Sequence, residues 1–421
     1  MISFETARDK VIEVLTKRAD AAGAHALATE TVDLTSEPSR ALGRILQQDI
    51  VADRNYPPFN RSIRDGFAIR AADAAEPGAR LKLIGESRAG FAFDGTVGAG
   101  ECVYIFTGAA VPRGANAVVM QEHTRADGDF VVIQNAVHPG LHYVLAGAEA
   151  RIGEVMVPRG TRLSYAELAM AAEVGQAKLE VTRKPRVAII STGDELVTLG
   201  EPVGPFQIRN SNSISLAAQV TLAEGEPVVS GKVPDDVGHL RTEIEKALES
   251  SDILVLSGGV SVGKYDLVEQ VLHDLGTEIL FDAVAIRPGK PAVFGMCRGK
   301  PVFGLPGNPV STMVTFELFV VPAIEILSGS RQPRHLPVFR ARLKHPVNEK
   351  GIVAHFLPAR VSLLDETPEE PALPVVETVL WEGSGDIGAV VRGNCFLVVR
   401  ESRLTLEAGE WVDVMPRRGK F

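Results

Sequence analysis

The hydrophobic pattern from residue 186 onward alternates between short apolar runs and longer segments with helical spacing. RVAII (186–190) and DILVL (252–256) are typical of buried strands, and the segment SISLAAQVTLAEG between them carries apolar residues at intervals of three and four. Further strand-like runs and the apolar segment STMVTFELFVVPAIEIL follow. Alternating units of this length predict a central three-layer α/β domain, built on a largely parallel sheet, over residues 186–330.

The pattern before residue 186 predicts helices on either side of a β-rich stretch. Residues 4–19 have helical spacing, and a second helix is predicted after Pro38, with an apolar face over residues 41–46. Residues 157–175 predict a third helix. From about residue 80 to 145, short apolar runs are separated by glycine-rich turns, which is typical of strands.

The C-terminal part of the chain is also short-stranded and indicates a small β-barrel or sandwich. The whole pattern predicts a multidomain α/β protein with a central three-layer parallel-sheet domain, a β-rich insert, a helical linking subdomain and a C-terminal β-barrel. The expected bounds are 1–55 with 145–185 for the discontinuous helical subdomain, 56–144 for the insert, 186–330 for the α/β domain and 331–421 for the barrel.

Composition narrows the class of protein. The chain has 421 residues, which is too long for one hydrophobic core. Its formal charge of 44 − 53 = −9 argues against nucleic acid or an anionic membrane as the main partner. The three cysteines form no CxxC pair, so neither a disulfide framework nor a zinc knuckle is indicated. Because no secretory signal or membrane-length apolar stretch is recognised, we expect a cytoplasmic protein.

Three glycine-containing loops follow predicted strands, at the sheet edge where doubly wound folds bind ligands. They read STGDE (191–195), SGGVSVGKYD (257–266) and LPGNPVS (305–311), and none contains a GxxxxGK[ST] motif. Glycines let backbone N–H groups approach an anion, and serine hydroxyls add donors. A tight turn explains any one loop equally well, but three loops at one edge favour an oxyanion site. The substrate-binding candidates are Ser257, Gly258, Gly259 and Ser261.

Acidic side chains in the same loops conflict with a site for an anion. Asp194, Glu195 and Asp266 are expected near one edge, where carboxylates repel phosphate. A divalent cation resolves the conflict, because Mg²⁺ takes one or two carboxylates together with phosphate oxygens. We therefore predict a Mg²⁺ site with Glu195 and Asp266 as ligands. The alternative is that Asp194 or Glu195 only caps the following turn.

Two further segments carry candidate chemistry. In IRPGKPAVFG (286–295), Arg287 and Lys290 flank a rigid Pro-Gly turn and are followed by Pro291, an arrangement suited to a small dianion. Exposed basic turns are also common in proteins without such a site. In RSIRDGFAIR (61–70), Asp65 and the following glycine indicate a tight turn and nothing more by themselves.

Taken together, these segments resemble the MoeA family of molybdopterin molybdenumtransferases, which includes the E domain of gephyrin. The resemblance rests on the stretches NRSIRDGFAIR, TGAAVPRGANAVVMQEHT, VPRGTRL, RVAIISTGDELV, SGGVSVGKYDLV, IRPGKPAVFG, GLPGNPVSTMVTFEL and GSGD. They run in family order over nearly the whole chain, and several together are highly specific.

The resemblance implies four subdomains and a homodimer whose active site lies between the α/β unit of one subunit and the β-rich insert of the other. It implies Mg²⁺-dependent insertion of molybdenum from molybdate into adenylylated molybdopterin, with cleavage of the adenylate and release of AMP. The implied protein partners are a molybdopterin adenylyltransferase and molybdoenzyme apoproteins. Molybdate and tungstate are not distinguished by these motifs.

The family's functional residues match positions of this sequence one by one. The resemblance implies catalytic roles for Asp65, Thr107, Glu195, Asp266 and Lys290. It implies substrate or molybdate contacts for Arg287, Pro291, Ser311 and Ser384, and a further acid at Asp235 or Asp236. Two positions depart from the family pattern. Asn210 stands where aspartate is frequent. Pro358 stands where many members have arginine, so an oxyanion contact from the barrel is either missing or supplied by Arg360.

Two other functions are compatible with parts of the sequence. A molybdopterin adenylyltransferase shares the TGDEL and SGGxS motifs but would consist of little more than the α/β unit, whereas this chain has two further β-rich regions. A gephyrin-like scaffold protein normally carries a second fused domain and a long disordered linker. The chain has neither, so the transferase is the function that the sequence favours.

Overall fold

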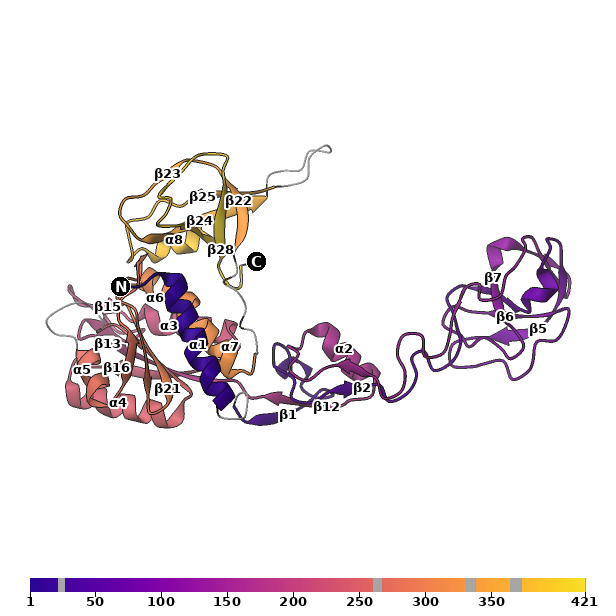
Figure 1. Cartoon of the computed structure of the whole chain (residues 1–421), viewed down its shortest axis with the longest axis horizontal. Coiled ribbons are helices and arrows are strands. Elements are labelled where there is room, and N and C mark those ends of the chain that lie inside the picture. The colour runs from indigo at the N-terminus through magenta and orange to yellow at the C-terminus, as the bar shows by residue number, and fades with distance from the viewer. Residues whose placement is uncertain are drawn as a thin grey trace. The chain divides into compact units, whose positions relative to one another are not determined.

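The computed structural model describes residues 1–21, 27–259, 267–330, 333, 336, 338–363 and 373–420 (Figure 1). The chain forms two compact units. Unit 1 comprises residues 1–31, 43–47 and 180–421, and unit 2 comprises residues 32–42 and 48–179. This is a multidomain α/β architecture, as the sequence predicted, while the division into four subdomains remains a prediction.

Unit 1 is built around a six-stranded sheet in the order β16-β13-β17-β21-β20-β18. The strands are β13 (Arg186–Thr192), β16 (Glu226–Val233), β17 (Ile253–Ser257), β18 (Glu278–Phe281), β20 (Val293–Cys297) and β21 (Lys300–Leu305). The first four strands in the order are parallel, whereas β20 and β18 are antiparallel to their neighbours. The expectation of a parallel sheet therefore holds for only part of the sheet. Arg298 and Gly299 have φ values of 48° and 75°, which make a tight turn and join β20 to β21 as a hairpin.

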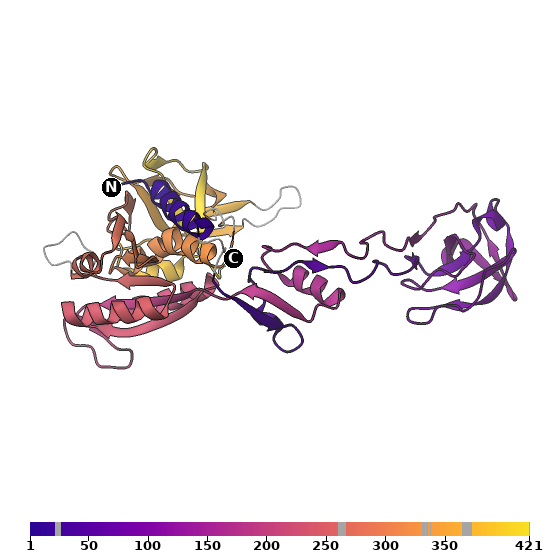
Figure 2. The ribbon, with the colours of Figure 1, turned by 60° about the horizontal axis from the view of Figure 1, so that its bottom comes forward.

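Helices cover both faces of this sheet (Figures 1 and 2). One core contains residues of α1 (Phe4–Ala21), α3 (Ser211–Leu222), α6 (Pro309–Thr315) and α7 (Val321–Leu327). The other contains residues of α4 (Val237–Ser250) and α5 (Leu267–Asp274). Alternate residues of β13 separate between them: Val187 and Ile189 belong to the first core, and Ala188 and Ile190 to the second. The three-layer prediction is confirmed in the described residues.

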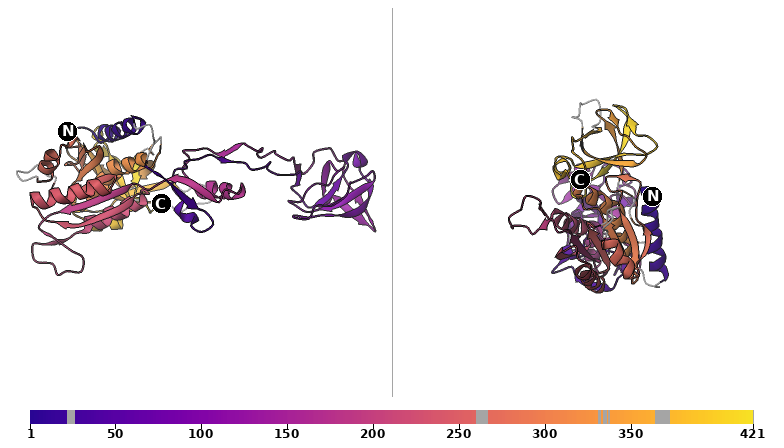
Figure 3. Two further views of the ribbon diagram at one scale, coloured as in Figure 1. Left: turned by 90° about the horizontal axis from the view of Figure 1, so that it is seen from below. Right: turned by 90° about the vertical axis from the view of Figure 1, so that its left-hand side faces the viewer.

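The helical segment from Pro309 to Leu327 is long and apolar enough to cross a membrane, with a mean hydropathy of 1.8, but 89% of it is buried inside unit 1. Its middle, Phe316–Val320, is a π-helical turn between α6 and α7. Pro322 has no N–H to donate to the carbonyl of Leu318 four residues earlier. The Arg8 guanidinium of α1 donates to that carbonyl at 3.1 Å instead (α1 is indigo in Figure 3). This segment is therefore a core helix.

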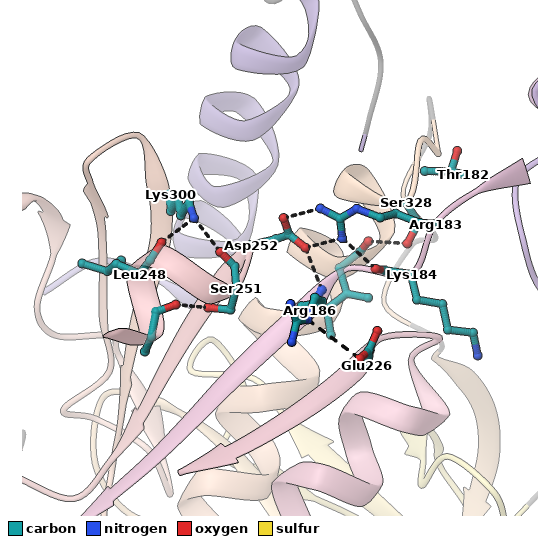
Figure 4. Close-up of polar contacts among 12 residues, drawn as sticks. Thr182, Arg183, Lys184, Arg186, Glu226, Leu248, Ser251, Asp252, Lys300 and Ser328 are labelled. Carbon is teal, nitrogen blue, oxygen red and sulfur yellow. Dashed lines mark hydrogen bonds and ion pairs between the residues drawn. The ribbon is translucent and has the colours of Figure 1, made fainter. Parts of the chain in front are cut away.

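At the amino ends of the strands, polar contacts connect successive segments of unit 1 (Figure 4). Arg183 donates twice to Asp252, through Nη1 to Oδ2 and Nη2 to Oδ1, each at 2.7 Å. The backbone N–H of Arg186 also donates to Asp252 Oδ2, at 2.8 Å. Lys300 Nζ donates to the carbonyls of Leu248 and Ser251. These contacts lie at the end of the sheet opposite to the glycine loops.

A closed five-stranded barrel follows the α/β part of unit 1. Its strands pair in the ring β24-β25-β22-β28-β26-β24, with β22 (Phe339–Leu343), β24 (Ala354–Leu363), β25 (Pro374–Thr378), β26 (Cys395–Val399) and β28 (Trp411–Pro416). Leu357 and Leu397 face the barrel core, whereas Phe356 and Phe396 join the helix-covered core of the α/β part. The helix α8 (Ile387–Arg392) accompanies the barrel. The ring of pairings shows a barrel rather than a sandwich.

Unit 2 contains a six-stranded sheet in the order β7-β4-β6-β5-β9-β8. Its strands are β4 (Gly66–Ile69), β5 (Arg80–Ser87), β6 (Glu101–Ile105), β7 (Ala117–Met120), β8 (Thr124–Asp127) and β9 (Phe130–Ile133). The single α-helix among the described residues of this unit is α2 (Tyr165–Glu173), where Ser164 and Glu167 form a capping box and Gly175 has a φ of 75°. This helix confirms the one predicted within residues 157–175.

The helix predicted over residues 41–46 is wrong. Only a short 3-10 turn, η1 (Pro38–Arg40), forms there, and Gly43 adopts a φ of 77°, which an α-helix does not accommodate. Leu46 is bridged to Val181, a partner far away in sequence. The remaining short strands are β1 (Thr29–Asp33), β2 (Ile50–Val51), β3 (Arg61–Ser62), β10 (Tyr143–Val144), β11 (Val155–Val157), β12 (Lys178–Thr182), β14 (Leu196–Val197), β15 (Ile208–Arg209), β19 (Ile286–Arg287), β23 (Val347–Asn348) and β27 (Thr405–Leu406).

Candidate functional site

A cavity of about 380 Å³ lies in unit 1 where β13, β17 and β21 end. We call it the loop cavity. It is lined by the loops that follow these three strands, by the strand β15 and by the first residues of α3. The three loops that the sequence singled out therefore meet at one site, as expected for the carboxyl edge of a parallel sheet.

Glycine is required at position 258, where two of these loops touch. Gly258 has a φ of 92°, and a Cβ there would lie 2.7 Å from the carbonyl oxygen of Thr192. A Cβ at Gly307 would lie 3.6 Å from the Cα of Gly258. The loops after β13, β17 and β21 thus approach one another through their backbones. A side chain at Gly258 would push the first two loops apart, whereas a Cβ at Gly307 would make an ordinary contact.

Asn212, near the start of α3, ties two of the loops together. Its Nδ2 donates to Ser257 Oγ and to the carbonyl of Gly307, both at 2.8 Å. Because Ser257 Oγ accepts this bond, its own hydrogen remains available for an acceptor in the cavity. Asn212 Oδ1 and Ser191 Oγ are buried without a hydrogen-bond partner among the described residues. Sequence analysis selected Ser257 but missed Asn212, whose only signal was its place at a helix start.

The acids of the first loop point in different directions. Glu195 lines the loop cavity, and a Cβ at Gly193 would lie 2.6 Å from its Oε2. Asp194 instead accepts a hydrogen bond from the backbone N–H of Asp235 at 3.3 Å. Asp235 also lines the cavity, whereas Asp236 caps α4 by accepting from His239 N. The described lining of the cavity therefore contains two carboxylate residues, Glu195 and Asp235.

Only one of the two predicted metal ligands, Glu195, lies within the described part of the chain. Ser261 and Asp266 fall in residues 260–266, outside the described part of the chain. Within the residues described, no group of three or more His, Cys, Asp or Glu side chains could hold a metal ion. Ligation of Mg²⁺ by Glu195 and Asp266 remains a prediction.

The other predicted contacts of unit 1 divide into two groups. Ser257, Gly258, Gly259 and Pro291 line the loop cavity, whereas Arg287, Lys290, Ser311 and Ser384 are not among its described lining residues. Arg287 and Lys290 are exposed, and Ser311 is buried in α6. The carbonyl of Ser384 accepts a hydrogen bond from the N–H of Val310 at 3.0 Å, next to the loop that follows β21.

Arg209 is a cationic residue in the lining of the loop cavity that the sequence did not single out. It lies in β15, a two-residue strand that is too short for a hydrophobic pattern to reveal. The neighbouring Asn210 caps α3, because its Oδ1 accepts from Ser213 N at 3.1 Å. An aspartate would cap the helix in the same way, so the departure at this position removes one negative charge from the cavity wall.

The second departure lies in the barrel. Pro358 is buried in β24 opposite Phe396 of β26. Arg360 is exposed and stands opposite Glu377 of β25. Neither residue is among the described residues that line the loop cavity.

In unit 2, Asp65 and Thr107 meet directly. Asp65 Oδ1 accepts from the backbone N–H of Thr107 at 2.6 Å and from its Oγ1 at 2.9 Å. These two bonds, the backbone one first, lower the pKa of the exposed Asp65 carboxyl group. A Cβ at Gly66 would lie 1.9 Å from the carbonyl oxygen of Val119, which explains the Asp-Gly sequence. Asp65 and Thr107, which come from two different motifs of the sequence, thus form one polar pair.

Comparison with known families gives matches over most of the chain. The sequence models for the MoeA N-terminal region (domain I and II), the probable molybdopterin binding domain and the MoeA C-terminal region (domain IV) match residues 2–175, 188–326 and 340–416. Curated proteins with similar sequences include the molybdopterin molybdenumtransferases of Nostoc sp., 41% identical over 72% of this chain and 70% of that protein, and of Haemophilus influenzae, 32% identical over 99% and 98%. A crystal structure of the molybdopterin biosynthesis MoeA protein from Pyrococcus horikoshii OT3 covers 99% of this chain and 100% of its own, with 28% identity and a TM-score of 0.75.

Proposed function

The chain belongs to the MoeA family of molybdopterin molybdenumtransferases, and we propose that it inserts molybdenum from molybdate into adenylylated molybdopterin in a Mg²⁺-dependent reaction that releases AMP. The enzyme acts in molybdenum cofactor biosynthesis. The loop cavity is the observation that supports this reaction. Glycine-rich turns, Ser257 and Glu195 all line it.

The loop cavity binds the phosphate-bearing part of the substrate in this proposal. Gly258 and Gly259 both have positive φ values, 92° and 64°, so the backbone can turn closely around an oxyanion. Ser257 can donate its hydrogen to a phosphate oxygen because Asn212 already donates to its lone pair. Arg209 adds a positively charged residue to the lining of the same cavity. Fixed donors of this kind favour oxyanions without needing to reorganise.

The donor set fits Mg²⁺. Glu195 lines the cavity and its carboxylate makes no hydrogen bond to another described side chain, while Asp235 places a second carboxylate residue in the same lining. One or two carboxylates beside phosphate oxygens are the ligands that Mg²⁺ takes in proteins, and Asp266 is proposed as a further ligand. When bound, the ion would neutralise charge on the phosphoanhydride. Glu195 would hold it, with Gly193 leaving room for the carboxylate.

Molybdate is proposed to bind beside Arg287 and Lys290, with Pro291, Ser311 and Ser384 in the same region. Pro291 lines the loop cavity, and the Ser384 carbonyl contacts the start of α6, which also contributes to the lining. Exposed cations near a cavity suit a small dianion.

The proposal includes a cytoplasmic homodimer in which Asp65 and Thr107 of one subunit complete the site of the other. Their pairing supports it, since an exposed carboxylate held by two hydrogen bonds is already oriented for a ligand or a water molecule. A molybdopterin adenylyltransferase would supply the substrate, and molybdoenzyme apoproteins would receive the product.

Molybdate-dependent release of AMP from adenylylated molybdopterin tests the proposed function. Glu195→Gln should raise the Mg²⁺ concentration needed for half-maximal activity at least tenfold, because one anionic ligand is lost. Glu201→Gln is the matched control, since Glu201 is exposed and accepts only from the N–H of Thr198. Lys290→Ala and Asp266→Ala should lose activity, and replacing molybdate by tungstate gives the metal preference. Wild-type activity in both of these variants would overturn the assignment.

A further inference from the structure

Three aromatic side chains of unit 2 form a row that ends at the surface. The ring centroids of Phe67 and Tyr104 lie 5.3 Å apart, and those of Tyr104 and Phe106 lie 5.0 Å apart, both edge to face. Phe67 packs on the buried core of the unit, while Phe106 is 38% exposed. We call these three residues the aromatic row. Its last ring is held in place on one side and open on the other.

The support beneath Phe106 is rigid. Phe67 and Tyr104 are direct partners across β4 and β6. The Tyr104 hydroxyl donates to Gln121 Oε1 at 3.1 Å, which fixes the orientation of the middle ring. Edge-to-face packing then leaves the orientation of the Phe106 ring determined before any ligand arrives. A ring that does not have to be ordered on binding loses little conformational entropy.

The aromatic row ends beside the polar pair of the same unit. Thr107 directly follows Phe106, and its N–H and Oγ1 both donate to Asp65. Asp65 in turn lies two residues before Phe67. Phe106 is therefore next along the chain to the residue that binds the Asp65 carboxylate.

The described lining of the loop cavity contains no comparable aromatic surface. None of its lining residues among those described carries an aromatic ring. The proposed substrate contains two planar heterocycles, the pterin and the adenine. Planar heterocycles gain binding free energy by stacking on aromatic side chains, and the gain is largely independent of the identity of the ring. The described lining of the loop cavity thus offers contacts for charged groups and no aromatic ring for stacking.

We propose that Phe106 is a substrate-binding residue whose ring stacks against a planar heterocycle of the substrate, next in sequence to Thr107 of the Asp65–Thr107 pair. This inference rests on the proposed function for the identity of the heterocycle. In this inference unit 2 contributes a stacking contact to substrate binding, in addition to the contacts with charged groups that the loop cavity provides. Tyr104 and Phe67 position the Phe106 ring and do not contact the substrate.

Steady-state kinetics of three variants tests the proposal. Phe106→Leu keeps an apolar side chain without a ring and should raise KM for adenylylated molybdopterin about tenfold, with kcat changed little. Phe106→Trp should retain the wild-type KM. Phe91→Leu is the control, because Phe91 is a more exposed phenylalanine of the same unit, at 68%, paired with Arg88 and not with the aromatic row. An unchanged KM in Phe106→Leu overturns the proposal.

Direct binding separates this inference from the proposed function. Fluorescence of 6-carboxypterin, and calorimetry with AMP, should show weaker binding of one of these two probes to Phe106→Leu, which identifies the stacked heterocycle. If wild-type protein releases no AMP, the proposed function fails, and the probe titrations still decide on stacking. Equal binding of both probes by wild type and Phe106→Leu overturns the inference. So does a change of sedimentation coefficient in that variant, because Phe106 would then contact a second copy of the chain.

Discussion

Arg183 and Asp252 form a bidentate ion pair at the amino ends of the strands in unit 1, with two N···O distances of 2.7 Å (Figure 4). Asp252 precedes β17, and Arg183 lies between β12 and β13. Since the backbone N–H of Arg186 donates to the same carboxylate, three donors converge on Asp252. The pair thus joins the starts of two neighbouring strands, at the edge of the sheet opposite the loop cavity.

Asp252→Ala should destabilise unit 1 by about 2 kcal/mol, because it leaves a partly buried guanidinium and a backbone N–H without their acceptor. The urea midpoint of unfolding, followed by circular dichroism, measures the effect. Lys246→Ala is the control, since its contact with Glu243 is mostly exposed and should contribute little. Equal midpoints for the two variants would show that the bidentate geometry adds no stability.

Replacing Gly258 by alanine should cost more stability than replacing Gly276. Both glycines have positive φ, 92° and 74°, so both substitutions carry backbone strain of about 1 kcal/mol. Only at Gly258 would the new Cβ meet an atom, the Thr192 carbonyl oxygen at 2.7 Å, which adds about 1–3 kcal/mol. Urea unfolding of the two variants compares these costs. If Gly276→Ala lowered the urea midpoint more than Gly258→Ala, close packing of the loops would not explain why residue 258 is glycine.

Thr107→Val should raise the pKa of Asp65 toward its ordinary value. The rise should be partial, because the backbone N–H of residue 107 remains and is the larger cause of the lowered pKa. A lowered pKa in the folded state means that this contact stabilises the protein above the ordinary carboxyl pKa. That stabilisation is lost as the pH falls through the lowered value. Carboxyl ¹³C NMR titration of wild type and variant gives both values, and identical titrations would show that Oγ1 has no influence.

Cys102 and Cys395 should resist alkylation in the native protein. Burial raises the pKa of each thiol to about 12, so the reactive thiolate is scarce even at mildly alkaline pH. Iodoacetamide treatment followed by peptide mass spectrometry should find both cysteines unmodified until guanidinium is added. Rapid labelling of either residue in native protein would contradict its burial.

Sequence analysis predicted those elements whose hydrophobic pattern along the chain matches their burial in the folded protein. The apolar residues of RVAII and DILVL lie in β13 and β17, because helices cover both faces of the sheet and the buried positions 187–190 and 253–256 are then all apolar. The predicted helix over residues 41–46 failed for the opposite reason. Its apolar spacing serves a bridge between Leu46 and Val181, whose separation in sequence no local pattern reports.

Sequence analysis found those residues of the candidate site that lie in loops directly after strands. Glu195, Ser257 and Gly258 were found because glycine and polar residues follow apolar runs there. Arg209 and Asn212 were missed because they reach the same cavity from a two-residue strand and a helix start. Their position depends on how α3 packs, which is a property of the folded unit.

The hydrogen bond between Arg8 and the Leu318 carbonyl spans 310 positions of the chain, and Arg400 forms an ion pair with Glu5 at 2.7 Å. During translation, α1 therefore leaves the ribosome long before the surface that buries it has been made. Unit 2, contained within residues 32–179, has its own strands available much earlier. The nascent chain must keep the apolar face of an amphipathic helix unpaired while it completes another unit first, and this interval is where a chaperone would engage it.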